Sequence, residues 1–312
     1  MKFNYFSFIT LLLLSVLKIN AGVISDYIYN QRNAVGSFFG NKKNISYGGS
    51  ISATLDVYAN GNNSQNLKPV VIFVHGGAWI SGNKFEYQMI GNILSNNGYV
   101  AVLPNYLLSP MGSMDDMVND VYQCVLWTYK NISQYGGDNS RIILTGHSAG
   151  AHLSMLTVIK ATLNLENKGR QLQPLPKLEK LVLFNGPYDF NDYDMTSKLM
   201  GQYMNGGYFE QYLRVLFTSK YISPTNILKS YQANAINDLG VPQINFYAAD
   251  SDQLVPQSSA VNMMAQLRRV SPNTKINYIF NQGNGYDHFT LIVGCQMGSS
   301  KLQNMFIDLI KQ

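Results

Sequence analysis

A serine, a histidine and two aspartates stand where they could together perform nucleophilic catalysis. Ser148 lies in the segment GHSAG (146–150), which follows an apolar run and opens a helical stretch. A Gly-x-Ser-x-Gly pattern between a strand and a helix is typical of a sharp turn that exposes the serine hydroxyl. The flanking glycines remove side chains that would clash at such a turn. The sequence therefore predicts that Ser148 is a nucleophile at the positive end of the following helix.

A second motif, HGGAW (75–79), follows another apolar run. Acyl transfer develops negative charge on the carbonyl oxygen, and backbone N–H groups stabilise that charge; losing one donor typically costs about 2.7–4 kcal/mol. The motif and the nucleophile turn therefore predict an oxyanion hole. Its candidate donors are the backbone N–H groups of Gly76, Gly77, Ala78 and Ala149. We expect His75 to be a structural residue that holds this loop.

Of the chain's four histidines, His288 is the best placed to act as a general base. It lies in a glycine-rich loop after the last apolar run, where an imidazole can reach a serine at the upper edge of a sheet. We expect His147 to point away from the nucleophile and His152 to be packed. The matching acid follows the preceding apolar run, and Asp250 and Asp252 both stand there. The alternation of side-chain directions along an extended chain does not decide between these two residues, because side chains two residues apart point to the same face.

These residues need a scaffold that brings the ends of several strands together. Six apolar runs predict strands, at 70–74, 99–103, 141–145, 178–184, 243–248 and 275–280. Helical stretches fit between or after them, at 84–96, 113–134, 149–161, 258–270 and 296–311. Residues 41–66 are expected to form early loops or a strand pair. This alternation predicts the α/β class, with a mostly parallel, doubly wound sheet flanked by helices.

One long connection interrupts the alternation. Residues 187–231 separate the fourth and fifth runs and are dense in Tyr, Phe, Met and Leu. A connection this long usually has its own structure and often a role. We expect a small lid over the carboxyl ends of the strands, with aromatic side chains that line a pocket, form the lid's own core, or do both. The rest of 22–312 is expected to be a single domain.

The first 21 residues have the pattern of a targeting signal. A positive start, Met1-Lys2, precedes an apolar run from Phe6 to Leu17, and small residues follow. This pattern predicts a secretory signal removed after Ala21, so the chain would be secreted or lie in the lumen of the endoplasmic reticulum (ER). An uncleaved segment would instead hold it at a membrane, for example that of the ER. Three N-glycosylation sequons, at Asn44, Asn62 and Asn131, support the secretory interpretation weakly.

Composition excludes other classes. The net charge is +5, but no run of Lys and Arg exceeds two residues, so we expect no nucleic-acid partner. Two cysteines are too few for a disulfide scaffold. Cys124 and Cys295 fall in segments expected to cover opposite faces of the sheet, and a disulfide needs Cα atoms within about 7 Å. We therefore predict two free thiols.

The motifs together resemble the α/β-hydrolase carboxylesterases of the hormone-sensitive-lipase and arylformamidase type. Within that group the chain looks most like the isoprenylcysteine α-carbonyl methylesterases. The resemblance is close over about residues 69–160 and looser near 252 and 288. The chain departs from many relatives at Asn105 and Leu107, where they carry Asp and Arg.

The resemblance implies an α/β-hydrolase that cleaves a carboxylic ester, with no metal and no organic cofactor. The aromatic insertion favours a small apolar ester. A prenylcysteine methyl ester is one such substrate. The resemblance also implies that Asp252 is the triad acid, because DQLVP (252–256) is similar to the family's Asp-x-x-Val-Pro, whereas Asp250 would brace the turn. Asp287 is a third, less suitable candidate. The alternatives are amide hydrolysis of the arylformamidase type and a non-catalytic binding protein on this fold.

Overall fold

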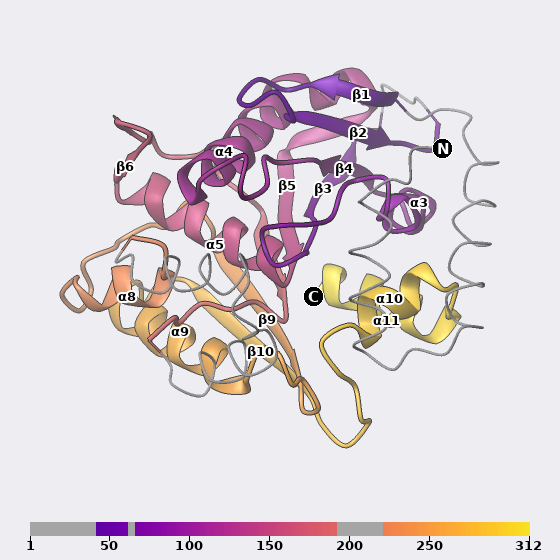
Figure 1. Ribbon diagram of the computed structural model, residues 1–312. Coiled ribbons are helices and arrows are strands. Elements are labelled where there is room, and N and C mark those ends of the chain that lie inside the picture. The colour runs from indigo at the N-terminus through magenta and orange to yellow at the C-terminus, as the bar shows by residue number, and fades with distance from the viewer. Residues whose placement is uncertain (1–41, 62–65, 192–220) are drawn as a thin grey trace.

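A twisted eight-stranded sheet runs through the molecule (Figure 1). The computed structural model describes residues 42–61, 66–191 and 221–312. The strand order is β1-β2-β4-β3-β5-β8-β9-β10. The strands are β1 (Lys42–Ser46), β2 (Thr54–Tyr58), β3 (Lys68–Val74), β4 (Val100–Pro104), β5 (Gly137–His147), β8 (Lys180–Phe184), β9 (Gln243–Ala249) and β10 (Lys275–Asn281).

The sheet is mostly parallel. From β4 through β10 each neighbouring pair is parallel, whereas β1 and β2 pair with each other, and β2 with β4, in antiparallel fashion. The central strands are apolar on both faces, as a sheet covered on both sides requires. Residues 70–74 and 180–184, for example, are buried throughout. The predicted α/β class and the mostly parallel doubly wound sheet are therefore confirmed, and the early strand pair is β1–β2.

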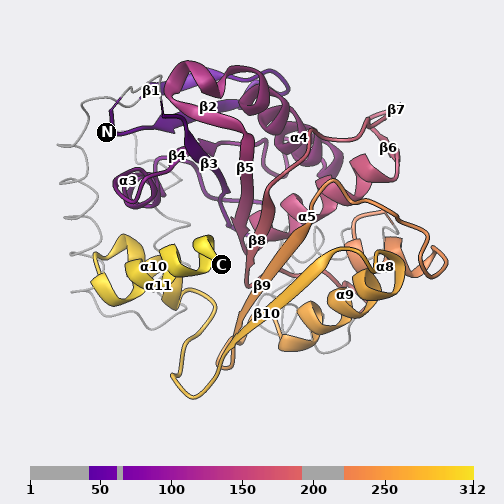
Figure 2. The ribbon, with the colours of Figure 1, turned by 180° about the vertical axis from the view of Figure 1, so that it is seen from behind.

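Helices cover both faces of the sheet. Opposite views of the molecule show α4, α5, α8 and α9 on one side and α3, α10 and α11 on the other (Figures 1 and 2). The bounds are α3 (Gln88–Asn96), α4 (Met114–Asn131), α5 (Ala149–Thr162), α8 (Pro224–Lys229), α9 (Gln257–Val270), α10 (Thr290–Gln296) and α11 (Ser300–Lys311). A 3₁₀ turn, η2 (Ile132–Tyr135), follows α4, and a short hairpin joins β6 (Glu166–Asn167) to β7 (Arg170–Gln171).

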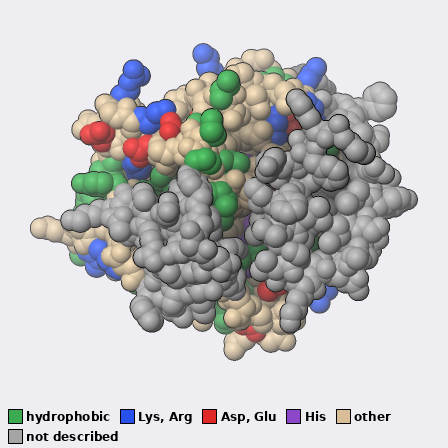
Figure 3. Space-filling view, in the orientation of Figure 1, with side chains coloured by type: hydrophobic (Ala, Val, Ile, Leu, Met, Phe, Trp, Pro, Cys, Tyr) green, Lys and Arg blue, Asp and Glu red, His purple; other side chains and the backbone are tan. Residues whose placement is uncertain are grey.

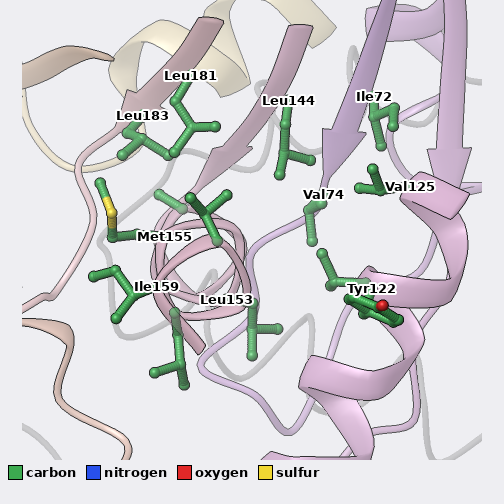
Figure 4. Close-up of a cluster of buried hydrophobic side chains, with 14 of the residues drawn as sticks. Ile72, Val74, Tyr122, Val125, Leu144, Leu153, Met155, Ile159, Leu181 and Leu183 are labelled. Carbon is green, nitrogen blue, oxygen red and sulfur yellow. The ribbon is translucent and has the colours of Figure 1, made fainter. Parts of the chain in front are cut away.

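The apolar core has two layers, one on each face of the sheet. Alternate strand residues point to opposite faces, so Ile72 packs toward α4 and α5 while Phe73 packs toward α11. Figure 4 shows part of the first layer, where side chains from β3, β5 and β8 meet those of α4 and α5. In the second layer the ring of Phe306 lies 6.2 Å from that of Phe73 and 5.3 Å from that of Phe184.

Two predicted helices are corrected. The helix expected from residue 84 begins at Gln88, because the Asn83 side chain accepts from the N–H groups of Phe85 and Glu86 and forms a turn there. The helix expected over 296–311 is α11, which begins only at Ser300, and a separate short helix that the sequence did not predict, α10 (Thr290–Gln296), precedes it. Gly298, at φ 83°, separates α10 from α11.

Two other predictions fall largely outside the described residues. The signal segment 1–21 does so entirely. Of the insertion 187–231, only the ends are described, and α8 belongs to the second of them.

The described surface carries interspersed charges. Basic and acidic side chains alternate along the upper part of the face shown in Figure 3, with apolar side chains between them. Lys168, for instance, pairs with Asp116 at the surface, whereas the Lys160 ammonium that pairs with Asp115 is buried. None of the described helices is both long enough and apolar enough to cross a membrane.

Candidate active site

Ser148 occupies a strained turn between β5 and α5. Its φ of 54° and ψ of −120° are rare for a residue with a side chain. The turn is held because the Ser148 N–H donates to the Phe184 carbonyl (2.8 Å) and the Ser148 carbonyl accepts from the His152 N–H (3.1 Å). Such strain persists where the surroundings over-determine it, which is common at functional sites.

The glycines beside Ser148 are required by close packing. A Cβ at Gly146 would collide with the backbone of Gly150, and a Cβ at Gly150 would collide with the carbonyl of Val74 at the end of β3. The turn and the start of α5 therefore lie directly against the backbone of β3. This packing brings the serine next to the loop that follows that strand.

The HGGAW loop lies against the nucleophile turn. A Cβ built on Gly76 would stand 3.3 Å from the Cβ of Ser148. Gly77, Ala78 and Trp79 all have positive φ, at 123°, 50° and 63°. Among the described residues, no group accepts a hydrogen bond from the backbone N–H of Gly77, Ala78 or Ala149. These N–H groups are therefore available to donate hydrogen bonds to an anion beside Ser148.

His288 and Asp252 form a buried pair. The Nδ1 atom of His288 lies 2.8 Å from Oδ2 of Asp252, and both side chains are almost fully buried. An imidazole held in this way donates its Nδ1–H to the carboxylate and keeps the lone pair of Nε2 free to accept a proton.

The surroundings of Asp252 keep its carboxyl ionised. Burial alone would raise its pKa, but the opposing effects of His288, the Val255 N–H and the Asn185 amide prevail, and the pKa is lowered from 3.8. Oδ1 accepts from the N–H groups of Leu254 (2.9 Å) and Val255 (2.8 Å). The carboxylate can therefore orient His288 and stabilise its protonated form.

The other two aspartates have different partners. Asp250 is exposed and accepts from the Gly283 N–H (2.6 Å), so it braces the turn between the ends of β9 and β10. Asp287 accepts from the N–H groups of Phe289 and Thr290 and caps the start of α10. Of the three acids considered from the sequence, Asp252 is the one that the structure brings to His288.

Sequence reasoning missed two residues that fix the pair. Asn185 directly follows β8, and its Nδ2 donates to Oδ2 of Asp252 (2.8 Å). His147 contacts the base rather than the nucleophile: its Nε2 lies 2.8 Å from the His288 carbonyl, and its ring centroid is 4.9 Å from that of His288. The signal for Asn185 was its place just beyond a buried strand, at the edge where parallel strands end together.

The remaining histidines are structural. The His75 ring is stacked between those of Tyr106 (4.4 Å) and Tyr87 (5.8 Å), and burial lowers its pKa to about 4. His152 is packed on α5, as expected, with both ring nitrogens engaged. The described part of the chain holds no cluster of His, Cys, Asp and Glu that could bind a metal ion.

Comparison with known proteins assigns this chain to a family. Residues 55–267 match the BD-FAE family. The "probable isoprenylcysteine alpha-carbonyl methylesterase ICMEL2" of Arabidopsis thaliana is 26% identical over 86% of this chain and 62% of its own length. The "isoprenylcysteine alpha-carbonyl methylesterase ICME" of the same plant is 29% identical over 75% of this chain and 54% of its own. The chain therefore spans between half and two thirds of these relatives.

Solved structures share the fold. An esterase from the archaeon Pyrobaculum calidifontis superposes with a TM-score of 0.66 at 17% identity, covering 94% of this chain and 92% of that one. Esterase B from Lactobacillus rhamnosis gives a TM-score of 0.63 at 19% identity, covering 96% of both chains. At these identities the likeness shows the α/β-hydrolase fold alone. The family match covers more than half of the chain, and the protein is therefore a member of the BD-FAE family with an α/β-hydrolase fold.

Proposed function

We propose that this chain is a serine carboxylesterase in which Ser148, His288 and Asp252 form the catalytic triad. The observation that carries the proposal is the buried His288–Asp252 pair, in a loop that His147 ties to the strained turn bearing Ser148. A histidine that already has a carboxylate on Nδ1 is prepared to accept a serine proton on Nε2. The names of the relatives, methylesterases and esterases, support the same chemistry.

The proposed reaction proceeds through an acyl-enzyme. The Ser148 Oγ attacks the ester carbonyl carbon while His288 takes its proton, and the C=O electron pair moves onto the oxygen. The oxyanion is stabilised by backbone N–H groups among those of Gly76, Gly77, Ala78 and Ala149. Collapse expels the alkoxide, which takes the proton from His288. Water then repeats the sequence at the acyl group and regenerates the free Ser148 hydroxyl.

We propose a small apolar carboxylic ester as the substrate, with a prenylcysteine methyl ester as the most specific candidate. The aromatic residues in the sequence of 187–231 support an apolar substrate. Phe190, at the start of that segment, packs edge to face against Trp79 of the oxyanion loop. The names of the two plant relatives support the methyl ester.

The test is an esterase assay on the purified chain from residue 22. Wild type should hydrolyse p-nitrophenyl acetate and butyrate with a burst of p-nitrophenol, and a fluorophosphonate should label it. Ser148→Ala should lose both properties. Ser154→Ala is the matched control: Ser154 is a buried serine on α5, and this variant should keep turnover and labelling.

Two further substrates define the ester class. N-acetyl-S-farnesylcysteine methyl ester should be cleaved with a higher kcat/KM than p-nitrophenyl acetate. N-formylkynurenine tests amide hydrolysis by the same triad, and a preference for it would replace the ester proposal. Absence of turnover and labelling in the wild-type protein would favour a binding protein.

We also propose that the chain enters the secretory pathway and loses residues 1–21. The composition of that segment and the exposed sequon asparagine Asn44 support this proposal. Expression in a eukaryotic secretory host, followed by N-terminal sequencing and deglycosylation, tests it. A start at residue 22 would support it, whereas an intact Met1 on a membrane-bound protein would support the anchor.

A further inference from the structure

The oxyanion loop contains two consecutive non-glycine residues in the left-handed region. Ala78 and Trp79 have φ of 50° and 63°. A bulky residue at positive φ is an outlier, and two in succession persist only if neighbouring groups hold them there. The direction of the Gly77 and Ala78 N–H groups depends on this stretch of backbone. Whatever holds Trp79 therefore also sets the geometry of the proposed oxyanion hole.

The Trp79 side chain is held by His152. Its indole Nε1–H donates to Nδ1 of His152 (3.1 Å), and the two rings meet at 90° with centroids 5.3 Å apart. Trp79 is 2% exposed and His152 is fully buried. The backbone of the same residue is fixed as well, because the Trp79 carbonyl accepts from the Ser109 N–H (2.9 Å).

The tautomer of His152 is fixed by a second contact. Its Nε2 lies 2.7 Å from the Ile222 carbonyl oxygen, which only accepts hydrogen bonds. Nε2 must therefore carry the proton, and Nδ1 presents the lone pair that Trp79 needs. Burial lowers the pKa of His152 to about 4, which keeps the ring neutral at pH 7.

These contacts join three separate parts of the chain. His152 lies one helical turn after Ser148 on α5, Trp79 belongs to the loop after β3, and Ile222 precedes α8. We propose that His152 is a positioning residue, which acts through Trp79 to aim the backbone N–H groups of the oxyanion loop. The proposal rests on the proposed esterase function and assigns a role in it to a residue outside the triad.

Kinetics of four variants test the proposal. His152→Phe keeps an aromatic ring but loses both hydrogen bonds, and Trp79→Phe loses only the indole donor. Each should lower kcat for p-nitrophenyl acetate by up to about 100-fold with little change in KM, because small misplacements of catalytic groups have effects of that size. The double variant should be no worse than the poorer single variant, because both substitutions remove the same Trp79–His152 hydrogen bond. His152→Gln can restore an acceptor and a donor, and should recover most of the loss.

A transition-state analogue and a packing control separate positioning from stability. A trifluoromethyl ketone places a hemiketal oxyanion in the hole, so its Ki should rise in proportion to the loss of kcat/KM. Leu156→Ala, one turn further along α5 and also buried, should lower Tm without this change. The proposal would be overturned if the losses of kcat in His152→Phe and Trp79→Phe multiplied in the double variant. It would also be overturned if these losses were no larger than the loss in Leu156→Ala.

Fluorescence tests the anchoring without requiring catalysis. Trp127 is the other tryptophan in the chain, so a Trp127→Phe background leaves Trp79 as the reporter. Adding His152→Phe should shift its emission and increase quenching by acrylamide, and unchanged values would overturn the proposal. If the wild-type protein hydrolyses no ester, the proposed function fails, and this measurement alone decides whether His152 holds Trp79.

Discussion

Asp252 is the residue whose surroundings are most specialised. Its carboxylate accepts from two backbone N–H groups on one oxygen and from Asn185 and His288 on the other. A buried carboxylate with this many donors costs little to keep ionised, and removing its charge affects chiefly the imidazole beside it.

We expect Asp252→Asn to keep the fold and lose about 10⁴ in kcat, by analogy with the serine-protease triad, because the amide favours the wrong tautomer of His288. Asp250→Asn is the matched control, since its partner is the Gly283 N–H at an exposed turn. That variant should lose some stability and little kcat. Steady-state assays and thermal melts of both variants check the assignment, which the reverse pattern would contradict.

The individual residues of the site were predictable to different degrees. Ser148 could be proposed from its GHSAG motif, and His288 from its place in a glycine-rich loop after the last predicted strand. Asp252 needed the family resemblance to separate it from Asp250. The contacts of Asn185 and His147 could not be derived, because each depends on which strand ends lie side by side and how far a loop folds back.

At the scale of elements, the close approach of α5 to β3 has a measurable consequence. Replacing glycine by alanine inside a helix normally gains about 1 kcal/mol. At Gly150 the added Cβ would meet the Val74 and His75 carbonyls. We therefore expect Gly150→Ala to lower Tm and to reduce kcat strongly, because α5 carries Ser148.

Ala151→Gly, at the next position of the same helix, is its control. This variant loses helix propensity but introduces no clash, so it should lose stability and retain kcat. Equal Tm values for Gly150→Ala and wild type would show that the helix can move away from the strand without cost.

The two cysteines also report on the arrangement of elements. The predicted free thiols are confirmed: Cys124 on α4 and Cys295 on α10 are both buried and unpaired, and they lie in the two different core layers. Burial raises the pKa of both thiols. We expect a thiol reagent such as DTNB to leave the native protein unmodified and to react with two thiols after unfolding. Rapid reaction of either in the native state, or a linked peptide in a non-reduced digest, would contradict this layering.

Strands were easiest to predict where apolar residues run continuously, as in β3, β4 and β9, which are largely buried. The edge strand β10 is only half-buried. The predicted bounds of all four strands agree with the structure to within two residues. Helix ends were harder to predict, because they depend on single side chains and turns, such as those at Asn83 and Gly298.

For the whole molecule, three buried histidines and the half-buried Glu86 contribute to the change of stability in mild acid. Burial lowers the pKa of His75 and His152 to about 4, and burial with the neighbouring His288 lowers that of His147 to about 3. Unfolded histidine titrates near 6.5. Between these values the unfolded chain binds protons that the folded chain does not, so these groups make stability fall as the pH is lowered.

Glu86 acts in the opposite direction. Burial raises its pKa to about 7, so the folded carboxyl keeps a proton that the unfolded chain releases above about pH 4.5. Near pH 5.5 these four groups should together take up about 3 − 1 = 2 protons on unfolding. Urea denaturation between pH 5 and 7 measures this slope. Glu86→Gln should steepen it by about one proton, and an unchanged slope would contradict the assignment.

The insertion between β8 and β9 is flanked by residues that bind one another. On its first side, Asn185 contacts Asp252 and the Tyr247 carbonyl, and the Tyr188 carbonyl accepts from the Thr225 N–H on its second side. Asp252, the proposed triad acid, is thus held by a residue that precedes the insertion and not by the intervening segment. Evolution, or a protein engineer, can therefore exchange the intervening segment for another while Asp252 and His288 keep their places.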